Sequence, residues 1–344
     1  MLTKINVIIP VFKPDNKLIQ IFDMLEKQTL PVSKIILMNT VNVSCSDVVN
    51  PIDMQGQEII SQCEKRGIIP TTVVEVSPQF FDHGGTRAKG ANYADEDAEY
   101  LLYMTQDAVP ADDKLTEELV NAFIFQNNVA VSYGRQLPSK ESSLAEVFTR
   151  GFNYPDSDAI KTAADIETIG IKAFFCSNVC AMYKKSIYDE LGGFIRKTIF
   201  NEDMIFANKI LKNGYTICYA SKAKVYHTHN YSGKQQYKRN FDLAVSQTLN
   251  PQAFEGISSE SEGIKYVKAA FVFFLKKGKP WLIIPFGINC VYKLAGYRKG
   301  KRIAELSLKE VMKCTSNPGF FNDISVGSDI VERVLRMNGI EYKK

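Results

Sequence analysis

The sequence has no uninterrupted apolar segment of the roughly 18 to 20 residues that a bilayer-spanning helix needs. Its opening residues, MLTKINVIIPVFKP, also lack the long apolar region and the small-residue cleavage site of a secretory signal. These two absences predict a protein that is either soluble or attached to a membrane surface.

The seven cysteines lack the pattern of a disulfide framework, because their number is odd and they are scattered along 344 residues. Free thiols in a reducing compartment are therefore expected. Cys176 and Cys180 lie close together in an apolar run, but no second Cys or His pair lies beside them. Buried thiols are a better interpretation of that pair than zinc ligands.

The chain also has little net charge, +4 in total, which argues against general nucleic-acid binding. With 45% hydrophobic and 23% charged residues, its composition is that of an ordinary globular protein with a substantial core. We find no internal repeat and no low-complexity tract. The basic residues gather toward the C-terminus, where they can meet an acidic surface.

Apolar strand-like runs alternate with helix-like stretches over the first half of the chain. The runs INVIIPVF, KIILMNT, TTVVEVS and YLLYM each read as a buried strand. This rhythm predicts an α/β fold whose mostly parallel sheet is flanked by helices. A polar loop is predicted through Asn50, and the mixed region 139–172 is predicted to form mobile loops over a site.

The pattern changes after about residue 250. We divide the chain into an α/β domain, 1–250, and a C-terminal helical region, 251–344, whose aromatic and aliphatic clusters are mixed with Lys and Arg. Such helices either lie in a membrane interface or form a subdomain or oligomer contact, and both interpretations stay open.

Three polar clusters stand at the ends of predicted elements: Thr105-Gln106-Asp107, Asn201-Glu202-Asp203 and His227-Thr228-His229. Open α/β sheets bind ligands beyond the carboxyl ends of their strands. Asp107 suits a divalent cation held against a diphosphate, although an isolated Asp at this position would more often only begin a turn before Pro110. The two histidines, spaced i and i+2, can point to one face as metal ligands or simply cap a loop.

In this order the three clusters, with the strings FDHGGTRAKGANYA and LLYMTQDAVP, resemble the inverting family 2 glycosyltransferases. Within that family the chain resembles bacterial rhamnosyltransferases of cell-surface polysaccharide synthesis, in which a Thr-Gln-Asp form replaces Asp-x-Asp. The resemblance covers roughly residues 4–245. It implies the GT-A nucleotide-diphospho-sugar transferase fold, with a C-terminal helical extension.

The resemblance implies a role for each cluster. Asp203 matches the general base that accepts the proton of the acceptor hydroxyl, with Glu202 in support. Asp107 matches the ligand of a Mg²⁺ or Mn²⁺ ion that bridges the donor diphosphate, and His229 or His227 would complete the metal shell. Acids in a first helical turn also occur for helix-dipole reasons alone.

Further residues match the donor and acceptor contacts of the family. The donor side is formed by Pro10, Val11, Phe12, Asn39, Gly85, Arg87 and Gln106, together with Asp107. Ser177 and Asn178 match the acceptor-side loop, where a simple turn is an equal alternative. Gln236 and Arg239 lie one helical turn apart and could face an acceptor or a phosphate, although a solvated helix face is the better interpretation of this pair.

The resemblance thus implies transfer of L-rhamnose from dTDP-β-L-rhamnose to a hydroxyl of a lipid-linked glycan, with inversion. It places the protein in the cytoplasm at the inner face of the cell membrane, with no nucleic-acid partner and with homo-oligomer contacts through the C-terminal helices. Two alternatives remain: a same-fold transferase of glucose or galactose, and a non-catalytic subunit that binds a nucleotide sugar.

Overall fold

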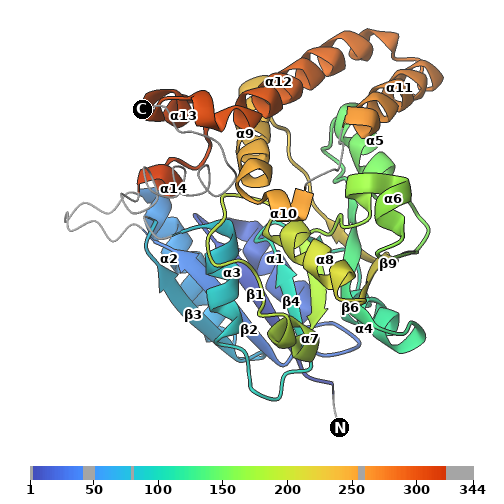
Figure 1. The fold of residues 1–344 in the computed structure, drawn as a ribbon. Helices are drawn as coiled ribbons and strands as arrows, with labels where there is room; N and C mark the ends of the chain where they lie inside the picture. The colour runs from blue at the N-terminus through green and yellow to red at the C-terminus, as the bar shows by residue number, and fades with distance from the viewer. Residues whose placement is uncertain (1–2, 42–50, 79–80, 255–259, 323–344) are drawn as a thin grey trace.

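The computed structural model describes residues 3–41, 51–78, 81–254 and 260–322 (Figure 1). The loop predicted through Asn50 lies outside the described residues. So do Cys45 and the last part of the predicted helical region, 323–344. The six cysteines within the described ranges all carry free thiols, as the sequence predicts.

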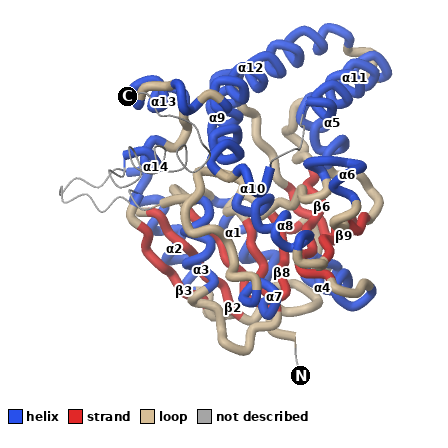
Figure 2. The backbone as a smooth tube through the Cα atoms, in the orientation of Figure 1, coloured by secondary structure: helices blue, strands red, loops and turns tan. Residues whose placement is uncertain are grey.

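The N-terminal half of the sheet is parallel, in the order β3-β2-β1-β4. Its strands are β1 (Ile5–Val11), β2 (Lys34–Thr40), β3 (Thr71–Val76) and β4 (Tyr100–Met104). The crossovers are α1 (Asn16–Leu25), α2 (Pro51–Lys65) and α3 (His83–Ala91). Helices cover both faces of this half (Figure 2), which explains why β1, β2 and β4 are buried along most of their length.

The second half of the sheet is mixed, because β8 (Cys180–Lys184) runs antiparallel between β4 and β6 (Val129–Leu137). Beyond β6, β9 (Thr216–Tyr226) pairs in parallel, and β5 (Val109–Pro110) and β7 (Ala159–Lys161) pair with β9 in antiparallel fashion. The prediction of an α/β fold is confirmed, but the sheet is parallel only in part. An apolar strand that is buried on both faces carries no sequence signal of its direction.

Alternate side chains of the sheet enter two separate apolar cores. Ile8, Ile36 and Tyr103 belong to one core, and their neighbours Val7 and Ile35 belong to the other. The first core also contains side chains of α8 (Glu202–Lys212), which packs on that face. The sheet therefore fixes both the strand ends and the start of α8.

Region 139–172 is not the set of loops predicted from its composition. It contains α5 (Leu144–Asn153) and α6 (Asp165–Ile169) as well as β7. Leu144, Phe148 and Phe152 recur every four residues and pack against the C-terminal helices. Ser143 caps the start of α5 by accepting a hydrogen bond from the Glu146 N–H at 3.2 Å. The prediction was wrong because polar residues between these aromatic positions mask the helical period.

The C-terminal region is helical, as predicted, over its described residues. The remaining helices are α4 (Leu115–Phe125), α7 (Lys185–Glu190), α9 (Gly233–Leu249), α10 (Pro251–Phe254), α11 (Glu260–Lys276), α12 (Ile283–Lys301), α13 (Leu308–Cys314) and α14 (Pro318–Asn322). In Figure 1, α11 and α12 project away from the sheet. No helix in the described ranges is long and apolar enough to cross a bilayer.

Glycines bring α12 into backbone contact with α9. A Cβ placed on Gly296 would lie 2.1 Å from the Tyr237 carbonyl oxygen, and one on Gly300 would lie 2.4 Å from that of Phe241. Neither distance is compatible with a real side chain, so these two positions require glycine. The contact locks α12 to the α/β domain.

Candidate active site

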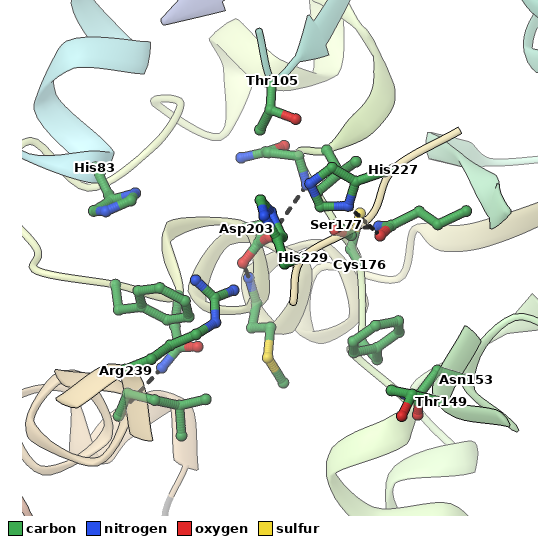
Figure 3. A pocket seen from close by; sticks show the side chains of 18 of the residues that line it. His83, Thr105, Thr149, Asn153, Cys176, Ser177, Asp203, His227, His229 and Arg239 are labelled. Atoms are coloured by element: carbon green, nitrogen blue, oxygen red, sulfur yellow. Dashed lines mark hydrogen bonds between the residues drawn. The ribbon is translucent and has the colours of Figure 1, made fainter. Parts of the chain in front are cut away.

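A cavity of about 580 Å³ lies beyond the carboxyl ends of β4, β6 and β9 (Figure 3). Eight of the predicted site residues line it: Arg87, Asp107, Ser177, Asn178, Glu202, Asp203, His227 and His229. These residues come from five separate segments of the chain. Asp203, Ser177, His227 and His229 lie near the centre of the view, with His83 and Thr149 toward opposite sides.

Asp107, His227 and His229 form a cluster in which one potential ligand atom of each lies within 4.8 Å of the others. His227 Nε2 is 3.5 Å from Asp107 Oδ1, and His229 Nε2 is 3.5 Å from Asp107 Oδ2. These separations are long for hydrogen bonds. Ligands that each stand about 2.1 Å from one ion are roughly 3 Å apart, so the arrangement suits a shared cation.

Gln136, at the end of β6, fixes the tautomer of His227. Its Oε1 atom lies 2.9 Å from His227 Nδ1 and has no hydrogen to donate, so the bond requires a proton on Nδ1. His227 Nε2 then presents its lone pair to the cluster. The Gln136 Nε2 atom donates to Tyr154 Oη at 2.5 Å and to Ser177 Oγ at 3.0 Å. This buried amide therefore connects the cluster to the predicted acceptor-side loop.

The charge states in the cluster favour cation binding. Burial works to raise the pKa of Asp107, but His227 and His229 outweigh it and hold that pKa below its ordinary value. Burial lowers the pKa of His227, and it lowers the pKa of His229 to about 3 with a further contribution from His227. Near neutral pH the cluster thus offers one carboxylate and two neutral imidazoles, a donor set that fits a divalent cation.

Asp203 lies at the first turn of α8, where Asn201 adopts the left-handed conformation with φ of 62° and directs the turn toward the cavity. Asparagine tolerates this region better than most residues. Asp203 Oδ1 accepts a hydrogen bond from the Met204 N–H at 2.8 Å, and Oδ2 accepts one from the Asn178 N–H at 3.2 Å. The carboxylate is therefore held in a defined orientation.

Burial, and then the neighbouring charge of Glu202, raise the pKa of Asp203 to about 7. The two backbone N–H groups and Arg87 oppose the shift without cancelling it. A carboxylate that titrates near neutrality is suited to take a proton from a substrate hydroxyl. The geometry gives Asp203 the properties of a general base.

Glu202 points into the protein and has a supporting position. Its Oε1 atom pairs with Arg87 Nη1 at 3.2 Å and accepts a hydrogen bond from Asn178 Nδ2 at 3.0 Å. Asn178 in turn accepts a bond from Tyr183 Oη at 2.9 Å. These contacts orient the loop that holds Asp203. They occupy the amide of Asn178 and the Nη1 atom of Arg87 within the protein, while the buried Nε atom of Arg87 has no partner among the described residues.

The other predicted donor residues lie outside this cavity. Gln106 joins the loops after β4 and β1, because its amide exchanges hydrogen bonds of 2.7 and 2.9 Å with the backbone of Phe12. Phe12 itself is exposed, whereas Val11 and Asn39 are buried and Pro10 is partly buried. Their contact with a nucleotide stays a prediction.

Gly85 and its neighbour Gly84 have a packing role that explains their sequence. A Cβ on Gly84 would stand 2.2 Å from the Ile195 carbonyl oxygen, and one on Gly85 would stand 2.3 Å from that of Arg196. Asp82 caps the same turn by accepting a bond from the Gly85 N–H at 2.6 Å. The two glycines thus admit the backbone of residues 195–196, while the donor contact predicted for Gly85 stays untested.

Sequence reasoning missed several residues that line the cavity. Gln136 ends a strand just as Met104 does before Asp107, so the rule that identified Asp107 could also have found it. His83 appears in the HGGTR string, but burial between aromatic rings lowers its pKa to about 4. Lys293 reaches the cavity from α12, and nothing in its local sequence indicates this.

Comparisons with known proteins agree with the fold. Residues 57–192 match the model of glycosyl transferase family 2. The chain is 32% identical to the O-antigen chain rhamnosyltransferase RfbN of Salmonella typhimurium, over 94% of this chain and 98% of that protein. It is 35% identical to the O-antigen chain rhamnosyltransferase WbaN of Salmonella anatum, over 74% of this chain and 81% of that protein.

Two solved structures share the fold at low identity. The mannosyltransferase PcManGT of Pyrobaculum calidifontis, in complex with GDP-Man and Mn²⁺, superposes with a TM-score of 0.53 at 12% identity, covering 98% of this chain and 88% of that one. TarS 1–349 of S. aureus, in complex with UDP-GlcNAc, gives 0.51 at 14% identity, covering 99% and 93%. The chain therefore belongs to the family 2 glycosyltransferases, enzymes that move a sugar from a nucleotide-sugar donor to an acceptor.

Proposed function

We propose that the protein transfers L-rhamnose from dTDP-β-L-rhamnose to a hydroxyl of a lipid-linked cell-surface glycan, with inversion at the anomeric carbon. The observation that carries the proposal is the placement of Asp203 in one cavity with the Asp107–His227–His229 cluster. The rhamnosyltransferase names of the two relatives support the choice of sugar.

The proposed reaction is a single displacement. The acceptor oxygen attacks the anomeric carbon, the bond from that carbon to the diphosphate oxygen breaks, and Asp203 takes the hydroxyl proton. The leaving dTDP departs with the bonding electron pair. A divalent cation, when bound, neutralises the charge that develops on this diphosphate. Asp107, His227 and His229 would hold the cation, and Asn178 and Met204 keep Asp203 aimed at the acceptor.

The donor set favours Mn²⁺ over Mg²⁺. Imidazole nitrogen suits the transition metals, carboxylate oxygen suits Mg²⁺ and Mn²⁺, and a mixed set is best satisfied by Mn²⁺. Mn²⁺ is therefore expected to support higher activity than Mg²⁺ at equal concentration.

A donor panel tests the reaction. Purified protein with Mn²⁺ and a lipid-linked acceptor glycan should release dTDP from dTDP-β-L-rhamnose, and EDTA should stop the release. Release only from nucleotide-activated glucose or galactose would refute the donor assignment. No release from any donor, with native folding verified, would refute transfer by this cavity.

We also propose that residues 263–304, here called the basic hairpin, dock on an anionic membrane surface. This segment of α11 and α12 contains ten Lys or Arg residues and no Asp or Glu. Its exposed apolar side chains are Ile264, Val267, Phe271, Val272, Leu275, Trp281, Ile284, Ile288, Val291 and Leu294. Such a patch of apolar and cationic side chains matches the boundary between acyl chains and acidic headgroups.

The bilayer fits the basic hairpin better than a second copy of the chain does. Three of the ten cations pair with acids that flank the segment, Lys265 with Glu262, Lys299 with Glu310 and Arg302 with Glu305, and Lys293 lines the cavity. Self-association through this surface would still bring the other six cationic side chains against six others with no acidic partner in the segment. A vesicle of acidic lipid supplies both the opposite charge and the apolar phase. The homo-oligomer expectation stays untested.

Vesicle flotation tests the docking surface. The protein should float with phosphatidylglycerol vesicles and not with pure phosphatidylcholine vesicles. Trp281 and Ile284 are 60% and 72% exposed, and changing both to Ser should reduce flotation at least tenfold. Ile124→Ser is the matched control, because Ile124 is 66% exposed on α4, outside the hairpin. Equal flotation of the double variant and wild type would refute the proposal.

A further inference from the structure

Some of the cationic side chains that line the cavity form ion pairs with carboxylates, and others do not. Arg87 pairs with Glu202 at 3.2 Å, and Arg150 pairs with Glu146 at 2.7 Å. Each of these arginines is therefore neutralised locally. The Asp107–His227–His229 cluster is the proposed site of the divalent cation. Two further cations of the cavity, Arg239 and Lys293, have no such carboxylate partner among the described residues.

Arg239 comes from α9 and lies flat against two aromatic rings. Its guanidinium carbon is 4.6 Å from the centre of the Phe200 ring and 5.6 Å from that of Tyr231. Stacking of this kind positions the guanidinium while leaving its N–H edge available for hydrogen bonds. Figure 3 shows Arg239 among the side chains of the cavity.

Lys293 lies on α12, in the C-terminal helical region. Its Nζ atom lies 5.3 Å from the centre of the Tyr266 ring, and its side chain lines the cavity. Burial lowers the pKa of Lys293; nearby Cys290 and Glu146 oppose that change, and Arg239 reinforces it. Glu146 forms its direct ion pair with Arg150, so Lys293 has no direct ion-pair partner among the described residues although its side chain is partly buried. An unpaired cation there costs free energy until an anion binds it.

The placement of Lys293 is rigid. Gly296 lies one helical turn after Lys293, and its contact with the Tyr237 backbone fixes this part of α12 against α9. Arg239 lies on α9 only two residues after Tyr237. The same helix contact therefore sets the positions of both unpaired cations.

We propose that Lys293 and Arg239 form an anion subsite that binds a phosphate or diphosphate ester of the acceptor, near the sugar that receives the new linkage. This inference rests on the proposed transfer and specifies the chemistry of its acceptor. Lys293 belongs to the basic hairpin, so the subsite lies where the cavity meets the surface assigned to the membrane. A glycan joined to a lipid through a phosphate ester would present its sugar to Asp203 and its anion to these cations.

The nucleotide donor also carries a diphosphate, so the test must separate the two sources. Farnesyl diphosphate is the probe, because it joins a diphosphate to an apolar chain, and uncharged farnesol is its control. Binding is measured by titration calorimetry on the full chain, with dTDP and Mn²⁺ present at saturation to fill the donor side. Binding of dTDP is measured separately, so that failure of the proposed donor is recognised on its own.

Wild type should bind farnesyl diphosphate and not farnesol. Lys293→Gln and Arg239→Gln should each weaken this binding about tenfold, the size expected for one hydrogen bond to a charged group. Lys293→Arg should retain it. Lys234→Gln is the matched control, since it removes one charge from α9 at an exposed position outside both the cavity lining and the basic hairpin.

Two results would overturn the inference. If farnesyl diphosphate binds only in the absence of dTDP, and Lys293→Gln weakens dTDP itself, the cations serve the donor and the acceptor assignment fails. If Lys293→Gln and Arg239→Gln bind the probe as wild type does, or farnesol binds equally well, there is no anion subsite at this place.

Discussion

Replacing the proposed base, Asp203, with Asn should remove activity and at the same time stabilise the fold at high pH. The reason is that the ionised carboxylate is costly where it stands. Its pKa is raised from 3.8 to about 7, mainly by burial and then by Glu202. Between these two values the folded chain holds a proton that the unfolded chain has lost, so this group makes stability fall as pH rises from about 4 to 7.

The magnitude follows from the shift. About 3 pKa units correspond to ~4 kcal/mol of unfavourable free energy when Asp203 is ionised at pH 8. An Asn side chain avoids this cost, but its amide can accept only one of the two backbone N–H bonds from Asn178 and Met204, which costs roughly 2 kcal/mol. The net gain is ~2 kcal/mol at pH 8, or about 3 °C in Tm for a chain of this length. At pH 5 the two effects nearly cancel.

Thermal unfolding of wild type and Asp203→Asn at pH 5 and pH 8 measures this difference. Asp113→Asn, at an exposed carboxylate, is the control and should leave Tm unchanged at both pH values. Sugar transfer by Asp203→Asn should fall by about 10²- to 10⁴-fold while dTDP binding persists. In wild type, kcat/KM should rise with pH up to about 7 and then level off. If the Asn variant gains no more stability over wild type at pH 8 than it does at pH 5, the ionised Asp203 is not costly; if it keeps wild-type turnover, Asp203 is not the base.

Two other perturbations test the supports of the site. Gln136→Leu should weaken Mn²⁺ affinity, measured with dTDP present, about 10- to 100-fold, because His227 loses the acceptor that fixes its tautomer. Gln136→Glu should keep the wild-type Mn²⁺ affinity. If the Leu variant also binds Mn²⁺ with wild-type affinity, Gln136 does not have this role. Gly296→Ala should lower the free energy of unfolding by about 1 to 3 kcal/mol, because its Cβ would meet the Tyr237 carbonyl oxygen. Gly287→Ala lies on the same helix with open space around it and should raise the free energy of unfolding by up to ~1 kcal/mol. Denaturant titration measures both changes, and equal changes in the two variants would contradict the close contact of α12 with α9.

The sequence was sufficient to predict the parts of the site that stand at element ends. Asp107 follows β4, Asp203 starts α8 and His227 follows β9, each as expected from local pattern. Their convergence could be inferred only through the family resemblance, because no local pattern reports which strand ends are neighbours. The antiparallel direction of β8 was missed for the same reason.

Residues that act through packing were harder to predict. Asn178 reads as a turn residue, yet its backbone and side chain hold both acids of α8. Lys293 belongs to a helix whose local sequence is apolar and basic on all sides, and only its glycine contact with α9 brings that lysine to the cavity. Contacts between distant segments of this kind have no counterpart in periodicity or spacing.

Asp107, His227 and His229 are proposed to hold the cation of the donor complex. Electron spin-echo modulation of Mn²⁺ bound with dTDP reports directly on nitrogen atoms that coordinate the metal. We expect ¹⁴N modulation from imidazole in wild type and its loss when His227 and His229 are both replaced by Ala. Mn²⁺ that binds with dTDP to wild type and shows no ¹⁴N modulation would contradict the proposal.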